Sequence, residues 1–328
     1  MTLLSLFHNS NVQKKNVLIF GEDAVLNDYL ATSYIKESQF KDMEKVVIDC
    51  DSDGLDELIA TLTEASLFSS QKLVMVKNPF FLTAKMPAKF KKQSLQLQTI
   101  FENLDQLDDI LILVASYDKL DKRKKLTKIV QRNLNVIETS FKPYEVSGII
   151  KSIINQEGYQ ISKSALQLLL ERSDQVMDTA LSGYNKLKIS SNNRQISEQD
   201  VAQNIDLSLA QNVFAIIESA IKQNYNDAMA RLQDQLREGI SPIQLIAVFE
   251  NQIETLLCVK ILSERKRSES QIVKELKIHP YRVKLALKSK INSKKLKQLL
   301  LNLIDLDYGY KNGTYHDDNM LKLFILNC

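Results

Sequence analysis

Short apolar runs alternate with amphipathic stretches along the first 140 residues. Five runs have the length and composition of buried strands: VLIF (17–20), KVVID (45–49), KLVMV (72–76), ILILVA (110–115) and NVIE (135–138). Helical patterns separate most of them, and this alternation is typical of βαβ units that build a parallel sheet covered by helices on both faces. The pattern therefore predicts an α/β domain over residues 1–143.

The strand pattern nearly stops after this point. Residues 144 to about 208 have the pattern of short helices, and SEQD before Val201 is a capping-box start for one of them. From Asn212 onward the pattern is nearly all helical, with breaks at 237–242, 277–281 and 311–318. We predict a small helical domain over 144–210 and an all-α bundle over 211–328.

Two large apolar residues do not fit this regular picture. Four residues upstream recur at i, i+3, i+4 and i+7 and form the buried stripe of an amphipathic helix: Leu55, Leu58, Ile59 and Leu62. At about 100° per residue, Leu67 and Phe68 would point away from that stripe if the helix ran on. The pair is either a contact for a partner or folds back onto its own sheet, and the pattern leaves both interpretations open.

Composition excludes several classes of protein. No apolar run approaches the length of a membrane span, about 18 residues. The first residues are briefly apolar, but they lack the basic leader and the cleavage site of a secretory signal. The three cysteines are far apart in sequence, which favours a reducing cytosol and gives no disulfide framework or zinc spacing. The three histidines also lack ligand spacing. We therefore expect a cytoplasmic protein without a metal site.

Positive charge is concentrated in one part of the chain. The net charge is +3, but residues 260–297 hold 13 Lys or Arg and 3 acidic residues, a net of +10, and the remainder carries −7. Such an asymmetry indicates a surface that faces something anionic. The segment fits a solvated face of a bundle, a phosphate-contacting surface, or a helix-turn-helix with SQIVKEL, a turn at KIHP and YRVKLALKS as recognition helix.

Six cations are candidates for contact with DNA or phosphate. Two lie in the basic segment, and four lie in a second, smaller cationic stretch after the fourth predicted strand: Arg282, Lys284, Lys119, Lys122, Arg123 and Lys124.

A nucleotide site would be expected after the first strand, in VLIFGEDAVLNDYL. A P-loop requires G-x-x-x-x-G-K-[ST], but Gly21 is followed by Glu22 and Asp23, with no second Gly, Lys or Ser/Thr in place. Two carboxylates at a helix start would repel a triphosphate. The third strand ends in Lys77 and Asn78 instead of magnesium-binding acids. We expect Gly21 to make a tight strand-to-helix turn, and we expect no catalytic or cofactor-binding residue; an unusual P-loop-less nucleotide hydrolase stays an alternative.

The order and spacing of several stretches resemble the delta subunit of the bacterial DNA polymerase III clamp loader. The stretches are LIFGEDAVL, SLFSSQKLVMVKN, YDKLDKRKKLTK, LSGYNKLKI with ISEQDV, NVFAIIESAIKQN, IHPYRVKLAL and LDYGYKNG, and they extend over nearly the whole chain. The resemblance implies an AAA+-like α/β domain that binds no nucleotide, a helical lid domain and an all-α collar domain. It also implies a non-catalytic subunit that binds and opens the sliding clamp during DNA replication.

The resemblance assigns partners and contact residues as well. In the family, a Leu-Phe pair enters a hydrophobic pocket of the ring-shaped beta clamp, which here implies Leu67 and Phe68 with the small neighbours Ala65 and Ser66. The implied partners are the ATPase gamma/tau subunits and delta-prime in a hetero-pentamer, together with primed DNA. A helix-turn-helix regulator remains the competing interpretation from another class.

Overall fold

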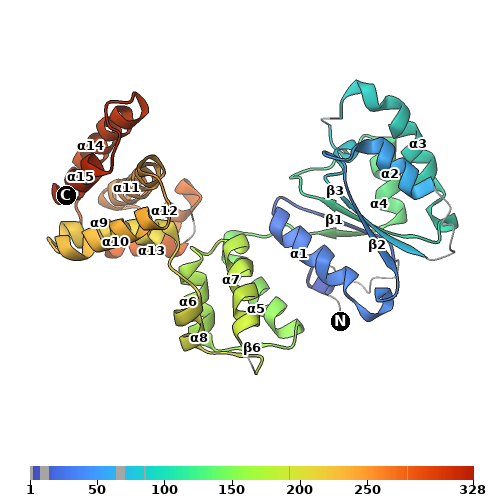
Figure 1. Ribbon diagram of the computed structural model, residues 1–328, viewed down its shortest axis with the longest axis horizontal. Coiled ribbons are helices and arrows are strands. Elements are labelled where there is room, and N and C mark those ends of the chain that lie inside the picture. Colours follow the sequence, from blue (N-terminus) through green and yellow to red (C-terminus); the bar gives the residue numbers. More distant parts are fainter. Residues whose placement is uncertain (1–2, 8–14, 64–70, 85, 192, 279) are drawn as a thin grey trace. The chain divides into compact units, whose positions relative to one another are not determined.

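The computed structural model describes residues 3–7, 15–63, 71–84, 86–191, 193–278 and 280–328 (Figure 1). The chain forms two units, Met1–Gln160 and Ile161–Cys328. Within the described residues, no helix is both long and apolar enough to span a bilayer.

A parallel five-stranded sheet forms the centre of the first unit. Its strands pair in the order β2-β3-β4-β1-β5, and all four pairings are parallel. The strands are β1 (Val17–Phe20), β2 (Glu44–Asp49), β3 (Lys72–Lys77), β4 (Ile110–Ala115) and β5 (Asn135–Glu138). Each lies within one residue of the predicted apolar run, so the sequence prediction of the sheet is confirmed.

Helices cover both faces of this sheet. Successive side chains of a strand point to opposite faces. Leu18, Val74 and Leu111 contribute to a buried cluster with α2 (Gly54–Thr63), α3 (Lys91–Glu102) and α4 (Lys125–Asn133). The other face packs against α1 (Ala24–Ile35), and Figure 1 shows α1 on the side of the sheet opposite α2. The last helix of the unit, α5 (Val146–Gln156), is followed by Glu157, which accepts a 2.5 Å hydrogen bond from Tyr29 of α1.

Three short helices open the second unit: α6 (Lys163–Arg172), α7 (Met177–Ser190) and α8 (Glu198–Asn204). The predicted capping box is confirmed, because Ser197 and Asp200 bond each other's backbone N–H at the start of α8. The guanidinium of Arg172 donates to the carbonyls of Val201, Ala202 and Ile205 at the end of α8. A two-residue pairing of β6 (Gln160–Ile161) with β7 (Gln195–Ile196) was not predicted.

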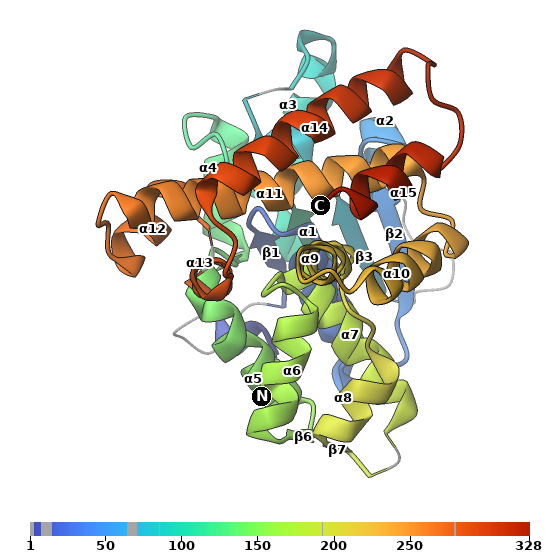
Figure 2. The same ribbon diagram turned by 90° about the vertical axis from the view of Figure 1, so that its left-hand side faces the viewer.

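Seven helices follow as a bundle: α9 (Leu209–Ile221), α10 (Tyr225–Arg237), α11 (Pro242–Glu264), α12 (Glu269–Leu276), α13 (Pro280–Lys288), α14 (Ser293–Lys311) and α15 (Asn319–Leu326). The two longest, α11 and α14, pack side by side (Figure 2). One cluster of buried residues, including Phe249 and Leu303, joins these helices. Each of the three predicted breaks overlaps the junction of two consecutive helices, α10 with α11, α12 with α13 and α14 with α15, although its outer residues belong to the helices in several cases. The boundaries predicted at 143 and 210 stay predictions.

Candidate functional site

The turn between β1 and α1 is closed by side-chain packing. A Cβ built on Gly21 would lie 2.1 Å from the Oγ1 of Thr139, a residue that follows β5 and is 1% exposed. The φ of Gly21 is not in the left-handed region. Glycine is therefore needed at this turn because a neighbouring strand end approaches closely, and not because of an unusual backbone conformation.

A buried asparagine holds this turn in place. Asn27, on the first turns of α1, donates from Nδ2 to the carbonyl of Gly21 at 2.9 Å and to the Oγ of Ser116 at 3.4 Å. Its Oδ1 accepts a 2.5 Å hydrogen bond from Thr139. Sequence reasoning did not identify Asn27; the available signal was a polar residue between Leu26 and Leu30 on the buried face of α1.

The start of α1 is capped from within the chain. The Oδ1 of Asp23 accepts a 2.8 Å hydrogen bond from the backbone N–H of Leu26. This carboxylate therefore satisfies a donor that a bound phosphate would otherwise use at a helix start. An acidic residue is favoured at this position, because its side chain caps the helix and its charge opposes the positive end of the helix dipole.

A cavity of about 500 Å³ lies next to this helix start. Eight residues line it, and they include three carboxylates and no Lys or Arg: Gly21, Glu22, Asp23, Asp118, Thr139, Ser140, Phe141 and Pro143. The electrostatic potential of such a lining is negative. The cavity therefore disfavours a triphosphate, which requires cations and free N–H donors.

The ends of β2 and β3 also lack the groups of a magnesium site. Lys77 forms a 2.5 Å ion pair with Asp28 of α1. Asn78 donates from Nδ2 to both carboxylate oxygens of Asp49, each at 3.0 Å. No cluster of His, Cys, Asp and Glu among the described residues could hold a metal ion. The carboxylate at the end of β2, Asp49, is therefore already hydrogen-bonded to the side-chain amide of Asn78.

The predicted contact pair lies outside the described residues, as do Ala65 and Ser66. The structure describes what comes before and after them. The predicted stripe on α2 is buried at Leu55, Leu58 and Leu62, and the helix ends at Thr63. On the far side, the N–H of Lys72 donates to Asp109 at 2.8 Å and fixes the first residue of β3. The orientation of Leu67 and Phe68 stays a prediction.

The smaller cationic stretch contains two different kinds of side chain. Lys119 and Lys122 are exposed, and Lys119 lies 3.4 Å from Asp118. Arg123 makes two hydrogen bonds to the carboxylate of Asp121, at 2.9 and 3.1 Å. Lys124 points inward: its Nζ donates to the carbonyl of Thr83 at 2.5 Å, and burial lowers its pKa. Two of the four cations are therefore already used in local structure.

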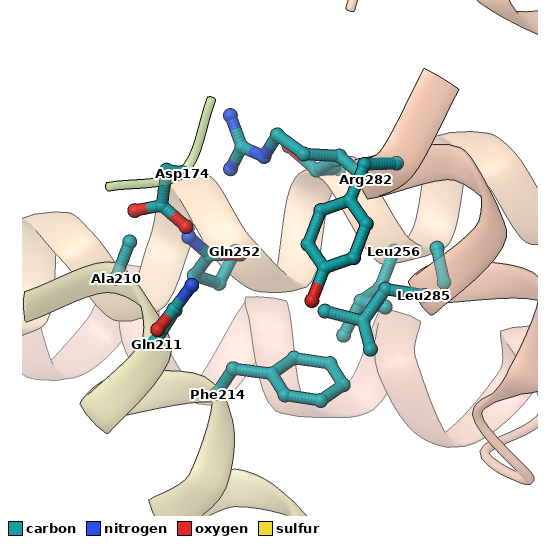
Figure 3. A pocket seen from close by; sticks show the side chains of 11 residues that line it. Asp174, Ala210, Gln211, Phe214, Gln252, Leu256, Arg282 and Leu285 are labelled. Carbon is teal, nitrogen blue, oxygen red and sulfur yellow. The ribbon is translucent and has the colours of Figure 1, made fainter. Parts of the chain in front are cut away.

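Arg282 lies at a small pocket inside the second unit. The pocket, of about 30 Å³, is close to the volume of one water molecule, and Figure 3 shows the side chains of Asp174, Gln211, Gln252 and Arg282 around it. Asp174 accepts a hydrogen bond from the hydroxyl of Ser208, the N-cap of α9. Burial raises the pKa of Asp174, and the hydroxyl and the charge of Arg282 act in the opposite direction.

The helix-turn-helix interpretation does not fit this arrangement. Helices α12 and α13 are indeed close in sequence, since α12 ends at Leu276 and α13 begins at Pro280. A recognition helix, however, presents the residues of its first turns to the bases. In α13 the corresponding residues Tyr281 and Arg282 line the internal pocket, and Val283 is buried. Lys284 is exposed, with its Nζ 3.9 Å from Glu269.

Comparison with known proteins supports one family over two long stretches of the chain. The family model for the DNA polymerase III delta subunit matches residues 18–140, and the model for its C-terminal domain matches residues 210–328. Together they cover well over half of the chain. The chain belongs to the DNA polymerase III delta subunit family.

Individual relatives agree with this assignment. DNA polymerase III subunit delta of Bacillus subtilis is 28% identical over 297 residues, covering 89% of this chain and 85% of that protein. The probable subunit delta of Aquifex aeolicus is 21% identical over 319 residues, covering 92% of this chain and 87% of its own. The solved structure of the Bacillus subtilis DNA clamp loader delta protein matches with a TM-score of 0.61 and 25% identity, over 96% of this chain and 95% of that one.

These findings confirm the resemblance and the predicted fold class. The delta subunit is a clamp loader component with an AAA+-like α/β region and a mostly helical C-terminal part. Neither alternative, the helix-turn-helix regulator or the nucleotide hydrolase, is supported by the comparisons.

Proposed function

We propose that this chain is the non-catalytic subunit that binds and opens the sliding clamp, so that partner ATPases can load it on primed DNA. One observation carries the proposal: in a member of the delta family, Asp23 caps the helix start where phosphate would bind, and carboxylates line the cavity beside it. ATP would then be bound and hydrolysed by the gamma/tau subunits.

We assign the clamp contact to Leu67 and Phe68, with the small residues Ala65 and Ser66 allowing close approach. Within the described residues, the stripe of α2 that packs on the sheet extends to Leu62, and the pair follows it in the sequence. Apolar anchors at the centre of an interface commonly contribute about 2 kcal/mol or more each to binding. A pair of this kind is sufficient to hold a partner whose surface offers a hydrophobic pocket.

The division of labour follows from the three predicted domains. Residues 1–143 would bind the clamp, 144–210 would form the lid, and 211–328 would join the collar with delta-prime and the ATPases in a cytoplasmic hetero-pentamer. The nucleotide state of the partners would expose or hide the Leu-Phe pair. To drive opening, the pair need only bind the opened clamp more tightly than the closed one.

Among the six cations predicted to contact DNA, we retain Lys119, Lys122 and Lys284 as candidates. All three are exposed. The ion pairs of Lys119 with Asp118 and of Lys284 with Glu269 are long, at 3.4 and 3.9 Å between nitrogen and oxygen. Arg123 and Lys124 are occupied by Asp121 and by backbone carbonyls. Their replacement would therefore alter local structure together with any contact to phosphate.

The test is the double variant L67A/F68A, measured in two ways. Binding to the immobilised sliding clamp from the same organism should be lost. The free energy of unfolding should change by no more than a surface substitution causes, about 0.5 kcal/mol, so the thermal midpoint should barely move. The matched control is V47A/L95A, which truncates two apolar residues of the same unit that are 54% and 56% exposed. The control should bind the clamp like the wild type.

A different pattern would contradict the assignment. If L67A/F68A melts at a much lower temperature, the pair belongs to the core, where truncation costs about 2–5 kcal/mol. If it binds the clamp as tightly as the control variant does, the contact lies elsewhere on the chain.

A further inference from the structure

The corner between α13 and α14 carries four exposed lysines. They are Lys288, Lys290, Lys294 and Lys297. Ser289 and Ile291, which alternate with the first two, are buried, so the connection turns its lysines outward. The corner is held by Lys260 of α11, whose Nζ donates to the carbonyls of Ser289 at 2.6 Å and Leu287 at 3.4 Å.

The local electrostatics of this corner are unfavourable without an anion. Within the part of the chain that the structure describes, no carboxylate lies within 4.0 Å of these four lysines. The first turn of α14 contains Lys294 and Lys295 and no acidic residue. The positive end of a helix dipole disfavours cations. The remaining N–H groups of α14 and the lysines therefore present one sign of charge to solvent.

More positive charge lies at the same end of the bundle. Arg265, Lys266 and Arg267 are exposed directly after α11, about one helical turn beyond Lys260, which contacts the corner. Figure 2 shows the end of α11, α13 and the start of α14 gathered at this end of the bundle. Glu264 and Glu275 are the exposed acids of residues 260–297.

The surface has no apolar anchors. The large exposed hydrophobic residues among the described part of the bundle, such as Leu301, Ile304 and Tyr308, all lie outside residues 260–297. Protein interfaces concentrate their binding energy in aromatic and apolar anchors, and membrane-bound helices insert apolar side chains. A cationic, polar surface without such groups instead fits the phosphate backbone of a nucleic acid.

We propose that the α13–α14 corner, formed by Lys288, Lys290, Lys294 and Lys297, binds the phosphate backbone of nucleic acid without reading bases. The corner lies within the basic segment 260–297, its four lysines are not among the six candidate cations, and it does not depend on the clamp contact. Because no aromatic side chain lies among the described residues of this corner, binding is insensitive to sequence and weakens steeply with salt.

The experiment compares two quadruple variants of the full chain. K288Q/K290Q/K294Q/K297Q removes the corner, and K41Q/K45Q/K91Q/K92Q removes the same charge from four exposed lysines of the first unit. Fluorescence anisotropy with a labelled oligothymidylate and a labelled random-sequence duplex is recorded over a series of KCl concentrations. For the corner variant, the slope of log K against log salt should become less steep by roughly 0.9 for each lysine that contacts duplex phosphate. The control variant should retain the wild-type slope.

Several results would overturn the proposal. Equal losses in both quadruple variants would mean that only net charge matters, and an unchanged slope in the corner variant would place the phosphates elsewhere. Wild-type binding to phosphatidylserine vesicles but not to DNA would identify a lipid surface. Circular dichroism checks that both variants fold. L67A/F68A should bind DNA like the wild type, so failure of the clamp assignment and failure of this proposal are distinguishable.

Discussion

Adding one methyl group at Gly21 tests whether close packing, and not phosphate binding, explains this glycine. The new Cβ would lie 2.1 Å from Oγ1 of Thr139 and 3.3 Å from its Cβ and carbonyl carbon. Thr139 cannot turn away easily, because its hydroxyl bonds Asn27 at 2.5 Å and the carbonyl of Phe20 at 3.0 Å. Overpacking of this kind costs about 1–3 kcal/mol, and we expect G21A to lose about 2 kcal/mol of stability.

A second substitution, T139A, tests whether the overlap with Thr139 causes the loss of stability in G21A. T139A removes the clashing oxygen but leaves the buried Oδ1 of Asn27 without its donor, at a cost of about 1–3 kcal/mol. In G21A/T139A the worst overlap is gone, so the two losses should not add. We expect a coupling of about 1–2 kcal/mol between the two positions. Urea unfolding followed by circular dichroism, with unchanged m-values, gives these free energies.

Gly148 supplies the control for the same chemical change. A Cβ at this position in α5 would meet nothing within 4 Å. G148A should therefore be neutral or stabilising by up to about 1 kcal/mol, because alanine favours a helix. The packing argument is refuted if G21A behaves like G148A, or if the losses in G21A and T139A are strictly additive.

Two further predictions concern the nucleotide position and the pocket of the second unit. Isothermal titration of the isolated chain with Mg-ATP should give no saturable heat, because Asp23 caps the helix start and carboxylates line the cavity; a one-to-one micromolar site would contradict this. R282Q should lower the free energy of unfolding by about 1 kcal/mol more than K284Q does, because Asp174 loses a nearby charge. K284Q should weaken DNA binding more than R282Q does, because Lys284 is exposed; a larger DNA defect in R282Q would instead make Arg282 a phosphate contact.

Periodicity and end signals were sufficient to predict the five strands of the parallel sheet and the helical character of the rest of the chain. The five strands and the capping box at Ser197 depend on local composition, which a single sequence displays. The pairing of β6 with β7 was missed because two residues are too short to show an alternating pattern. The position of Arg282 at the small pocket was also missed, because it depends on how α9, α11 and α13 pack and not on the pattern of α13 alone.

Some stretches that carry the family resemblance are explained by packing. A Cβ on Gly309 in LDYGYKNG would lie 2.1 Å from the ring of Tyr315, so glycine lets that ring close the hairpin between α14 and α15. A Cβ on Gly183 in LSGYNKLKI would lie 2.9 Å from a methyl group of Leu169. In YDKLDKRKKLTK, Lys124 holds the carbonyl of Thr83. These residues are therefore constrained by the fold, and their presence alone does not mark a binding site.

The loss of the nucleotide site involves several groups that now satisfy one another. A nucleotide needs free N–H groups at a helix start, a cation for phosphate and a carboxylate for magnesium. Here the N–H of Leu26 is bonded to Asp23, the ammonium of Lys77 to Asp28, and the carboxylate of Asp49 to Asn78. Replacing Asp23 alone would free one donor and leave both other pairs intact. We therefore expect that no single substitution restores nucleotide binding.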